Sequence, residues 1–169
     1  AKFDPEKARW FNQQYLRMRS SAQLSNELSP LLNEVGISAS PERISKSVDL
    51  LKERAFFVHD MLEGRFMFEA PSTYDEKLKS KKWNEESPTI LKNLKTHLLE
   101  VDPFEATALE VSFKVFLEKN DLGMGKVMPI LRLSITGVGM GPAIFDTLEI
   151  IGKEDFANRI DLACERLSA

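Results

Sequence analysis

Apolar residues recur along most of this chain at intervals of three and four, which places them on one face of an α-helix. The alternation of apolar and polar residues that is typical of β-strands is nearly missing. The segment 5–19 shows the pattern clearly, because Asp4 supplies an N-cap and Phe11, Tyr15 and Met18 fall on one stripe. The pattern therefore predicts an all-α fold.

The same periodicity, together with caps and breakers, predicts about ten helices. Proline and glycine mark many of the expected ends, and the D-x-x-E sequence from Asp102 to Glu105 is typical of a capping box. After 5–19, the expected helices cover 25–35, a segment starting at Ser40, 54–68, a short basic stretch after Tyr74, a segment starting at Ser87, the segment after Glu105, 126–136, 142–151 and 153–167.

The sequence APSTY at residues 70–74 interrupts the helical pattern and carries turn-forming residues. We therefore expect two packed helical subdomains, 1–72 and 73–169, that form a cage or bundle. No repeat of fixed period is present, so a solenoid is not expected.

Composition narrows the class of protein. The 169 residues are 43% hydrophobic and 29% charged, which is ordinary for a folded domain. No apolar run approaches the roughly 20 residues of a membrane-spanning helix, and the charged start AKFDPEKARW does not resemble a secretory signal. One cysteine excludes an internal disulfide framework, so a cytoplasmic location is expected. Because the chain does not start with Met, we expect a piece of a longer protein, with N-terminal processing as the alternative.

The sequence offers no active site and no metal site. The two histidines, His59 and His97, are isolated, and Cys164 next to an inward stripe is typical of a small buried hydrophobe. The glycines of GVGMG follow a helix, whereas dinucleotide-binding glycines follow a strand. We interpret them as a hinge that lets backbone amides come close to another group.

Arg132 is the unusual charge of the sequence, because it stands in a strongly apolar helix that ends in the glycine-rich turn. Burying a guanidinium without an acceptor is costly, so its end should reach a groove where phosphate, a carboxylate or an unstacked base serves as partner. The plainer alternative is an ion pair with a carboxylate of the same domain. Its apolar neighbours are Ile130, Leu131, Leu133 and Ile135.

Lysines cluster between residues 77 and 95, although the net charge of the chain is −3. A basic cluster indicates phosphate binding, and a solvated helix face is the alternative. The cluster consists of Lys77, Lys79, Lys81, Lys82, Lys92 and Lys95.

Several segments together resemble the C-terminal anticodon-binding region of bacterial glutamyl-tRNA synthetase, a class I aminoacyl-tRNA synthetase. They are KARWFNQQYL at 7–16, LLKERAFF at 50–57, YDEKLKSKKW from Tyr74, and VMPILRLSITG with the following GPAIFDTLEIIGKE at 127–154. The resemblance covers essentially the whole chain. It implies a helical cage that binds the anticodon loop of tRNA(Glu), within a parent ligase that attaches glutamate to tRNA with ATP and magnesium.

The resemblance also implies roles for particular residues. Arg54 corresponds to an arginine at the head of a helix that reads the third anticodon base. Arg132 corresponds to a donor to the other anticodon bases, the backbone of Gly141 and Pro142 to a close-approach surface, and Ile144 to an apolar face. Some relatives have threonine where this chain has Gly141, so a side-chain hydroxyl contact is not expected there.

The resemblance further implies that this chain has no catalytic residues and no cofactor of its own. Its expected partners are the tRNA(Glu) anticodon loop and the N-terminal catalytic domain of the same protein, and we expect a monomer that does not contact membranes. The alternative is a non-catalytic helical adaptor whose arginines pair with carboxylates of a protein partner. A sequence pI near 5.5 slightly favours that alternative.

Overall fold

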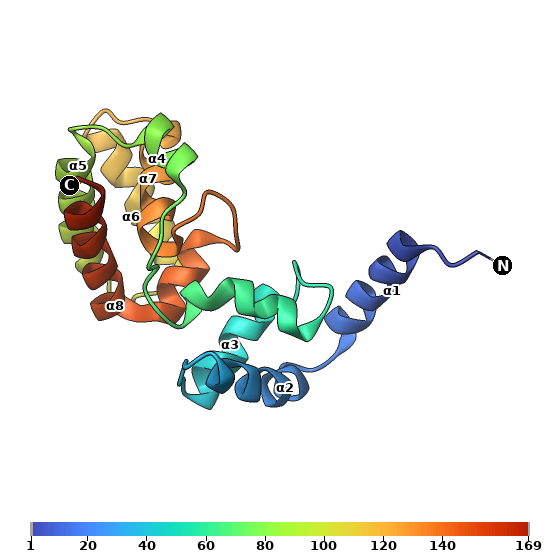
Figure 1. The fold of residues 1–169 in the computed structure, drawn as a ribbon. Coiled ribbons are helices and arrows are strands. Elements are labelled where there is room, and N and C mark those ends of the chain that lie inside the picture. Colours follow the sequence, from blue (N-terminus) through green and yellow to red (C-terminus); the bar gives the residue numbers. More distant parts are fainter. Residues whose placement is uncertain (1, 169) are drawn as a thin grey trace. The chain divides into compact units, whose positions relative to one another are not determined.

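A computed structural model describes residues 2–168 of the chain (Figure 1). These residues form nine helices and no β-strand, which confirms the all-α prediction. The chain divides into two compact units, residues 1–69 and 70–169. Whether they act as two anticodon-binding subdomains divided at residues 72 and 73 stays a prediction. None of the described helices is both long and apolar enough to cross a bilayer.

The first unit contains three α-helices and one 3₁₀ helix: α1 (Pro5–Met18), α2 (Ser21–Glu34), α3 (Pro41–Leu51) and η1 (Val58–Met67). Helix α2 packs against both α3 and η1. Leu24, Leu28 and Leu32 are fully or almost fully buried along one side of α2, at the four-residue spacing of a single helix face. This leucine face forms the centre of the unit.

Side-chain caps fix where the helices of the first unit begin. The Asp4 carboxylate accepts hydrogen bonds from the backbone N–H groups of Glu6 and Lys7, as the sequence predicts. Helix α2 begins at Ser21, earlier than the predicted residue 25, because Ser20 and Gln23 form a capping box. The sequence pattern S-x-x-Q carried this signal, and the prediction overlooked it.

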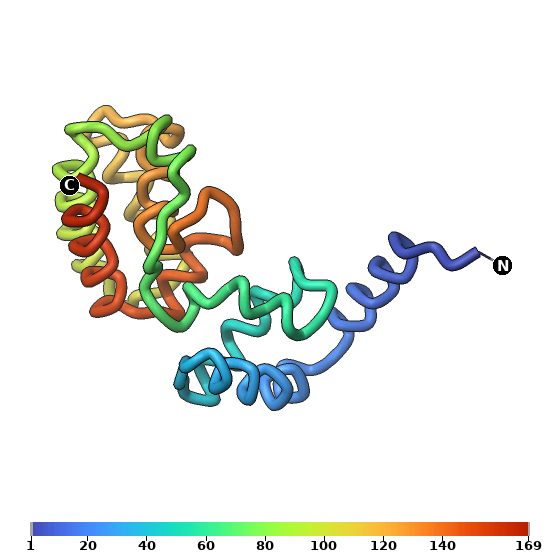
Figure 2. Tube along the Cα trace, in the orientation of Figure 1, coloured from blue at the N-terminus to red at the C-terminus, as the bar shows by residue number. Residues whose placement is uncertain are grey.

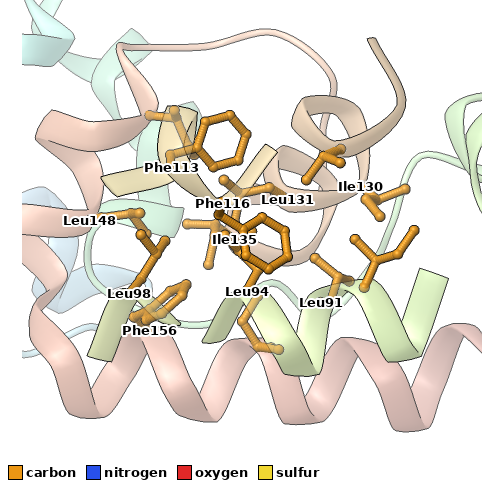
Figure 3. Close-up of a cluster of buried hydrophobic side chains, with 14 of the residues drawn as sticks. Leu91, Leu94, Leu98, Phe113, Phe116, Ile130, Leu131, Ile135, Leu148 and Phe156 are labelled. Carbon is orange, nitrogen blue, oxygen red and sulfur yellow. The ribbon is translucent and has the colours of Figure 1, made fainter. Parts of the chain in front are cut away.

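The second unit is a bundle of five helices: α4 (Glu76–Lys82), α5 (Ser87–Leu99), α6 (Ala106–Lys119), α7 (Met124–Thr136) and α8 (Ile144–Leu167). Helix α8 packs against α5, α6 and α7, and the tube in Figure 2 shows α5 and α8 running side by side. The core between these helices is made mainly of leucine, isoleucine and phenylalanine side chains (Figure 3). Phe113, Leu131, Leu148 and Phe156 have no exposed surface.

One predicted helix start in the second unit was wrong. Asp102 does not cap α6, since the helix begins at Ala106 and its N-cap residue, Glu105, makes no side-chain capping bond. Instead the Glu149 carboxylate on α8 accepts from the Ala106 N–H at 3.2 Å. The predicted break between the two closing helices is present within α8: Gly152 has φ of +85° and ψ of +169°, which are not helical, and two helical segments meet there.

Candidate nucleic-acid interface

Arg132 occupies the middle of α7 and is half-buried between the buried side chains of Leu131 and Leu133. Its Nη1 donates a hydrogen bond of 2.9 Å to the backbone oxygen of Pro142, which follows the glycine-rich turn. This bond spans the turn and holds the guanidinium beside it. The proposed ion pair between Arg132 and a carboxylate of the same domain stays a prediction.

The turn after α7 requires glycine at its first position. Gly137 has φ of +79°, and a Cβ atom built there would lie 2.5 Å from the Thr73 backbone oxygen. The Gly137 oxygen accepts from the Asp75 N–H at 2.8 Å. Segment 71–75 therefore packs closely on the turn, in agreement with the interpretation of these glycines as positions of close backbone approach.

A threonine hydroxyl holds the first residues of the turn on the helix. Thr136 Oγ1 lies 2.9 Å from the Arg132 backbone oxygen and 3.0 Å from that of Val138, and it also accepts from the Val138 N–H. The turn is thus bonded to α7 at its start through Thr136 and at its end through the Arg132–Pro142 hydrogen bond, so the arginine stands on a fixed support.

The other residues expected at this site differ in exposure. Gly141 is half-buried, Pro142 is buried, and Ile144 is 3% exposed within the core of the second unit. An apolar contact between Ile144 and a base requires surface that this side chain does not offer here. The exposed apolar side chains of the turn are Val138 and Met140, at 41% and 80%.

Helix α4 begins beside this turn and extends toward the start of α7, where Lys82 Nζ donates to the Gly125 oxygen. A Cβ atom on Gly139 would lie 3.1 Å from Cδ2 of Leu78, which is in the middle of α4. Lys77 and Lys81 on that helix are exposed. Lys95 belongs to the sequence cluster but forms a 2.7 Å ion pair with Asp161, so it is less available to an external phosphate.

Arg159 on α8 is a second arginine of this region, and the sequence reasoning did not select it. It has no exposed surface. Its Nε and Nη2 donate to the two carboxylate oxygens of Asp155, and its Nη1 donates to the backbone oxygen of Ile135 at 2.8 Å. The spacing of Asp155 and Arg159, four residues apart on a helix with inward apolar neighbours, was the available signal.

Arg54 belongs to the first unit and has an exposed side chain. It lies in the turn between α3 and η1, so the expectation that it heads a helix was wrong. Its backbone N–H donates to the Leu51 oxygen, and the neighbouring Ala55 is buried. Within residues 2–168, no hydrogen bond or ion pair occupies the Arg54 guanidinium.

The backbone that follows Arg54 is anchored by one carboxylate. Asp60 Oδ2 accepts from the N–H groups of Phe56 and Phe57, at 3.0 and 2.9 Å. Phe57 is 44% exposed and its ring stacks on His59. An exposed guanidinium next to a fixed backbone is suited to donate to a nucleotide without first reorganising its own support.

The described residues contain no group of three or more His, Cys, Asp and Glu side chains that could hold a metal ion. Cys164 is buried, and burial raises the pKa of its thiol, in agreement with the predicted core role.

The features that remain are arginines on fixed supports, a glycine-rich turn and a lysine-bearing helix. They define the chain as a helical binding domain.

Comparison with known proteins gives the class of this domain. A family model described as an anticodon binding domain matches residues 13–164. Glutamate–tRNA ligase of Flavobacterium johnsoniae is 46% identical over 168 residues, which are 99% of this chain and 33% of that protein. The corresponding enzyme of Porphyromonas gingivalis is 39% identical over the same lengths.

Solved structures of glutamate–tRNA ligases match this chain as well. The crystal structure of a glutamate tRNA ligase from Elizabethkingia meningosepticum, in complex with its amino acid, matches with a TM-score of 0.91 and 41% identity over 99% of this chain and 33% of that one. That of Elizabethkingia anophelis glutamate-tRNA synthetase gives a TM-score of 0.87 and 39% identity over 98% of this chain and 32% of that one.

The chain therefore belongs to the anticodon-binding domain family and matches the C-terminal third of bacterial glutamate–tRNA ligases. It spans about a third of the length of these relatives.

Proposed function

We propose that this chain is the C-terminal anticodon-binding part of a bacterial glutamate–tRNA ligase and that it binds the anticodon loop of tRNA(Glu). The observation that carries the proposal is the support of Arg132. Its guanidinium is bonded to the Pro142 oxygen beside a glycine-rich turn, in the unit that also carries the α4 lysines. Such a group can donate to an unstacked base while nearby lysines contact phosphates.

Arg54 is proposed to read the last anticodon base. The Watson–Crick edge of cytosine offers the acceptors O2 and N3 to a guanidinium, whereas guanine presents N1–H and N2–H donors that face the positive charge. Glutamate anticodons end in C and glutamine anticodons end in G. The exposed Arg54 side chain is therefore suited to favour tRNA(Glu) over tRNA(Gln).

Arg132 is proposed to donate to the other anticodon bases, while Gly141 and Pro142 offer backbone surface at close range. Ile144 is buried behind them, so its contribution is to fix the chain at the start of α8, and Met140 offers the exposed apolar surface. Lys77 and Lys81 are proposed to contact backbone phosphates.

In the parent ligase, ATP and magnesium support the attachment of glutamate to tRNA. The described residues supply neither a metal-binding cluster nor a Walker-type phosphate loop, so we place this chemistry in the part of the ligase outside them. The proposal includes a cytoplasmic location, a monomeric state, and contact with the catalytic part of the same protein.

A binding titration against added salt tests the proposal. Labelled tRNA(Glu) transcript is titrated with the chain at about 50 and about 200 mM salt. Two phosphate contacts, those of Lys77 and Lys81, predict a loss of affinity of about tenfold over this range. Binding that does not change with salt, or equal affinity for tRNA(Glu) and tRNA(Gln), would contradict the proposal and favour the protein-binding adaptor.

A further inference from the structure

Helix α1 contacts the rest of the first unit through one face. Leu16, 3% exposed, is the buried residue of this helix. The Asn12 side chain donates to the Phe56 oxygen, and Arg17 Nη2 donates to the Glu53 oxygen at 2.8 Å. The Arg9 guanidinium lies over the Phe56 ring. These contacts fix the inner face of α1 on the segment 53–56.

The opposite face of α1 is apolar and exposed. Phe11, Tyr15 and Met18 follow the i, i+4, i+7 spacing of a buried helix face, yet they are 56%, 63% and 85% exposed. Trp10, beside them, is 54% exposed and meets Phe11 edge to face. We call these four residues the outer stripe. In Figure 1, α1 extends away from α2 and α3, the other α-helices of its unit.

A contiguous exposed patch of large apolar side chains marks an interaction surface. The charges beside the outer stripe favour protein over nucleic acid as its partner. Arg17 pairs with Glu53 and Arg9 covers Phe56, so these two cations are engaged on the inner face. On the stripe side, Lys7 lies 5.9 Å from the centre of the Phe11 ring, and Arg19, which pairs with Glu27, lies 5.9 Å from that of the Tyr15 ring. RNA-binding aromatics work together with a basic groove, whereas the two cations at this face lie on separate rings and Glu27 neutralises one of them.

The position of α1 in the family alignment indicates which protein segment covers the stripe. The anticodon-domain model starts at residue 13, inside α1, so Trp10 and Phe11 precede it. The matched ligases are about three times as long as this chain, which corresponds to their C-terminal third. Helix α1 therefore lies where the preceding part of such a ligase joins this domain, and a tethered partner is present at high effective concentration.

We propose that the outer stripe packs against the part of the ligase that precedes residue 1 and that this contact fixes the junction between the catalytic and anticodon-binding parts. This inference rests on the proposed function, because it requires the chain to be part of a ligase. A junction held by a packed helix, and not by a flexible linker, would set the distance from the bound anticodon to the catalytic part.

The test places the double substitution Phe11→Gln with Met18→Gln in two proteins, the full-length ligase and the isolated chain. Glutamine keeps the helix propensity but removes the apolar surface. In the ligase we expect the first thermal unfolding midpoint to fall by about 4 °C or more, and proteolysis just ahead of α1 to become several-fold faster. In the isolated chain neither property should change, because both side chains are exposed there.

Val111→Gln is the matched control. Val111 is 59% exposed on α6 and lies outside the outer stripe, so its substitution should leave both proteins unchanged. Unsubstituted ligase is titrated with tRNA(Glu) in parallel. Absence of binding there would contradict the proposed function, whereas the unfolding and proteolysis results report on the junction alone.

Four results would overturn the junction proposal. The first is a doubly substituted ligase whose unfolding midpoint and proteolysis rate equal those of the unsubstituted ligase. The second is equal destabilisation of the isolated chain, which would place the partner of the stripe within these residues. The third is self-association of the isolated chain that the substitutions abolish, which would assign the stripe to a second copy. The fourth is weaker tRNA binding with unchanged unfolding and proteolysis, which would assign the stripe to RNA.

Discussion

Arg159 on α8 donates a 2.8 Å hydrogen bond to the backbone oxygen of Ile135, in the last turn of α7. The carbonyls of a helix's last turn have no partner within the helix and carry partial negative charge, so a buried guanidinium there acts as a C-terminal cap. Asp155 supplies the counter-charge through two hydrogen bonds. Arg159 thus fixes the end of the helix that carries Arg132.

Arg159→Met should destabilise the second unit strongly. The substitution leaves the Ile135 carbonyl and the Asp155 carboxylate without their arginine donor, and breaking a buried pair costs about 3 kcal/mol or more. Chemical denaturation of the isolated chain measures this loss. Arg166→Met is the matched control, because Arg166 donates one exposed hydrogen bond to Pro71 and its loss should cost less than about 1 kcal/mol. Equal losses for the two variants would contradict the capping role.

Arg54→Gln should reduce discrimination at the last anticodon base while leaving the fold intact. The Arg54 side chain is exposed, so its removal creates no cavity. A base contact of this kind supplies about 1 to 3 kcal/mol of discrimination. Anticodon hairpins whose last anticodon base is C or G are titrated with the variant. Its preference for C should be several-fold smaller than that of the unsubstituted chain. Arg65→Gln is the control, because Arg65 forms an exposed pair with Glu69. If the variant keeps the full preference for C over G, Arg54 does not read the last anticodon base.

Arg132→Ala should weaken anticodon binding about tenfold without unfolding the domain. The guanidinium makes a hydrogen bond to the Pro142 carbonyl, and one such bond contributes about 1 kcal/mol to stability. Lys114→Ala, which removes a surface pair with Glu110, serves as the reference for a neutral change. A large stability loss with unchanged RNA affinity would instead support the internal ion pair that the sequence left open.

Gly137→Ala and Gly36→Ala should differ although both residues have positive φ, +79° and +81°. A Cβ on Gly36 meets nothing within 4 Å, so that variant costs only the backbone strain, about 1 to 2 kcal/mol. On Gly137 the Cβ meets the Thr73 oxygen at 2.5 Å, which adds roughly 1 to 3 kcal/mol. Denaturation of both variants measures the difference, and equal effects would mean that the contact of segment 71–75 with the turn is loose.

Cys164 should react slowly with a thiol-alkylating reagent in the folded protein. Its side chain is 7% exposed, and burial raises the pKa of the thiol, so little thiolate is present at neutral pH. The reaction should accelerate at least tenfold in denaturant and should also rise with pH. Rapid modification of the native chain would contradict the packing of α8 against α5.

The all-α fold was predictable because most helices carry their signals locally. Asp4, Ser40 and Gly137 stand at helix ends where the sequence rules place such residues, and the structure uses them as caps. The start of α6 was not predictable in this way. Its first N–H bonds to Glu149, which is 43 residues further along the chain, so the determinant is tertiary.

The candidate site was predictable only in part. The apolar neighbours of Arg132 revealed an unusual arginine, but the periodicity did not show that Arg159 is the more deeply buried of the two. Burial of Ile144 depends on how α8 packs, which no local pattern contains. Likewise, the stripe of Phe11, Tyr15 and Met18 was visible in the sequence, whereas its exposure was not.

The most direct test of the central claim uses two anticodon stem-loops that differ only in the last anticodon base, C in one and G in the other. Each is titrated with the unsubstituted chain, and fluorescence anisotropy gives the affinity. Recognition by Arg54 predicts that the loop ending in C binds about tenfold more tightly. Equal affinity for the two loops, or no binding of either, would contradict the account.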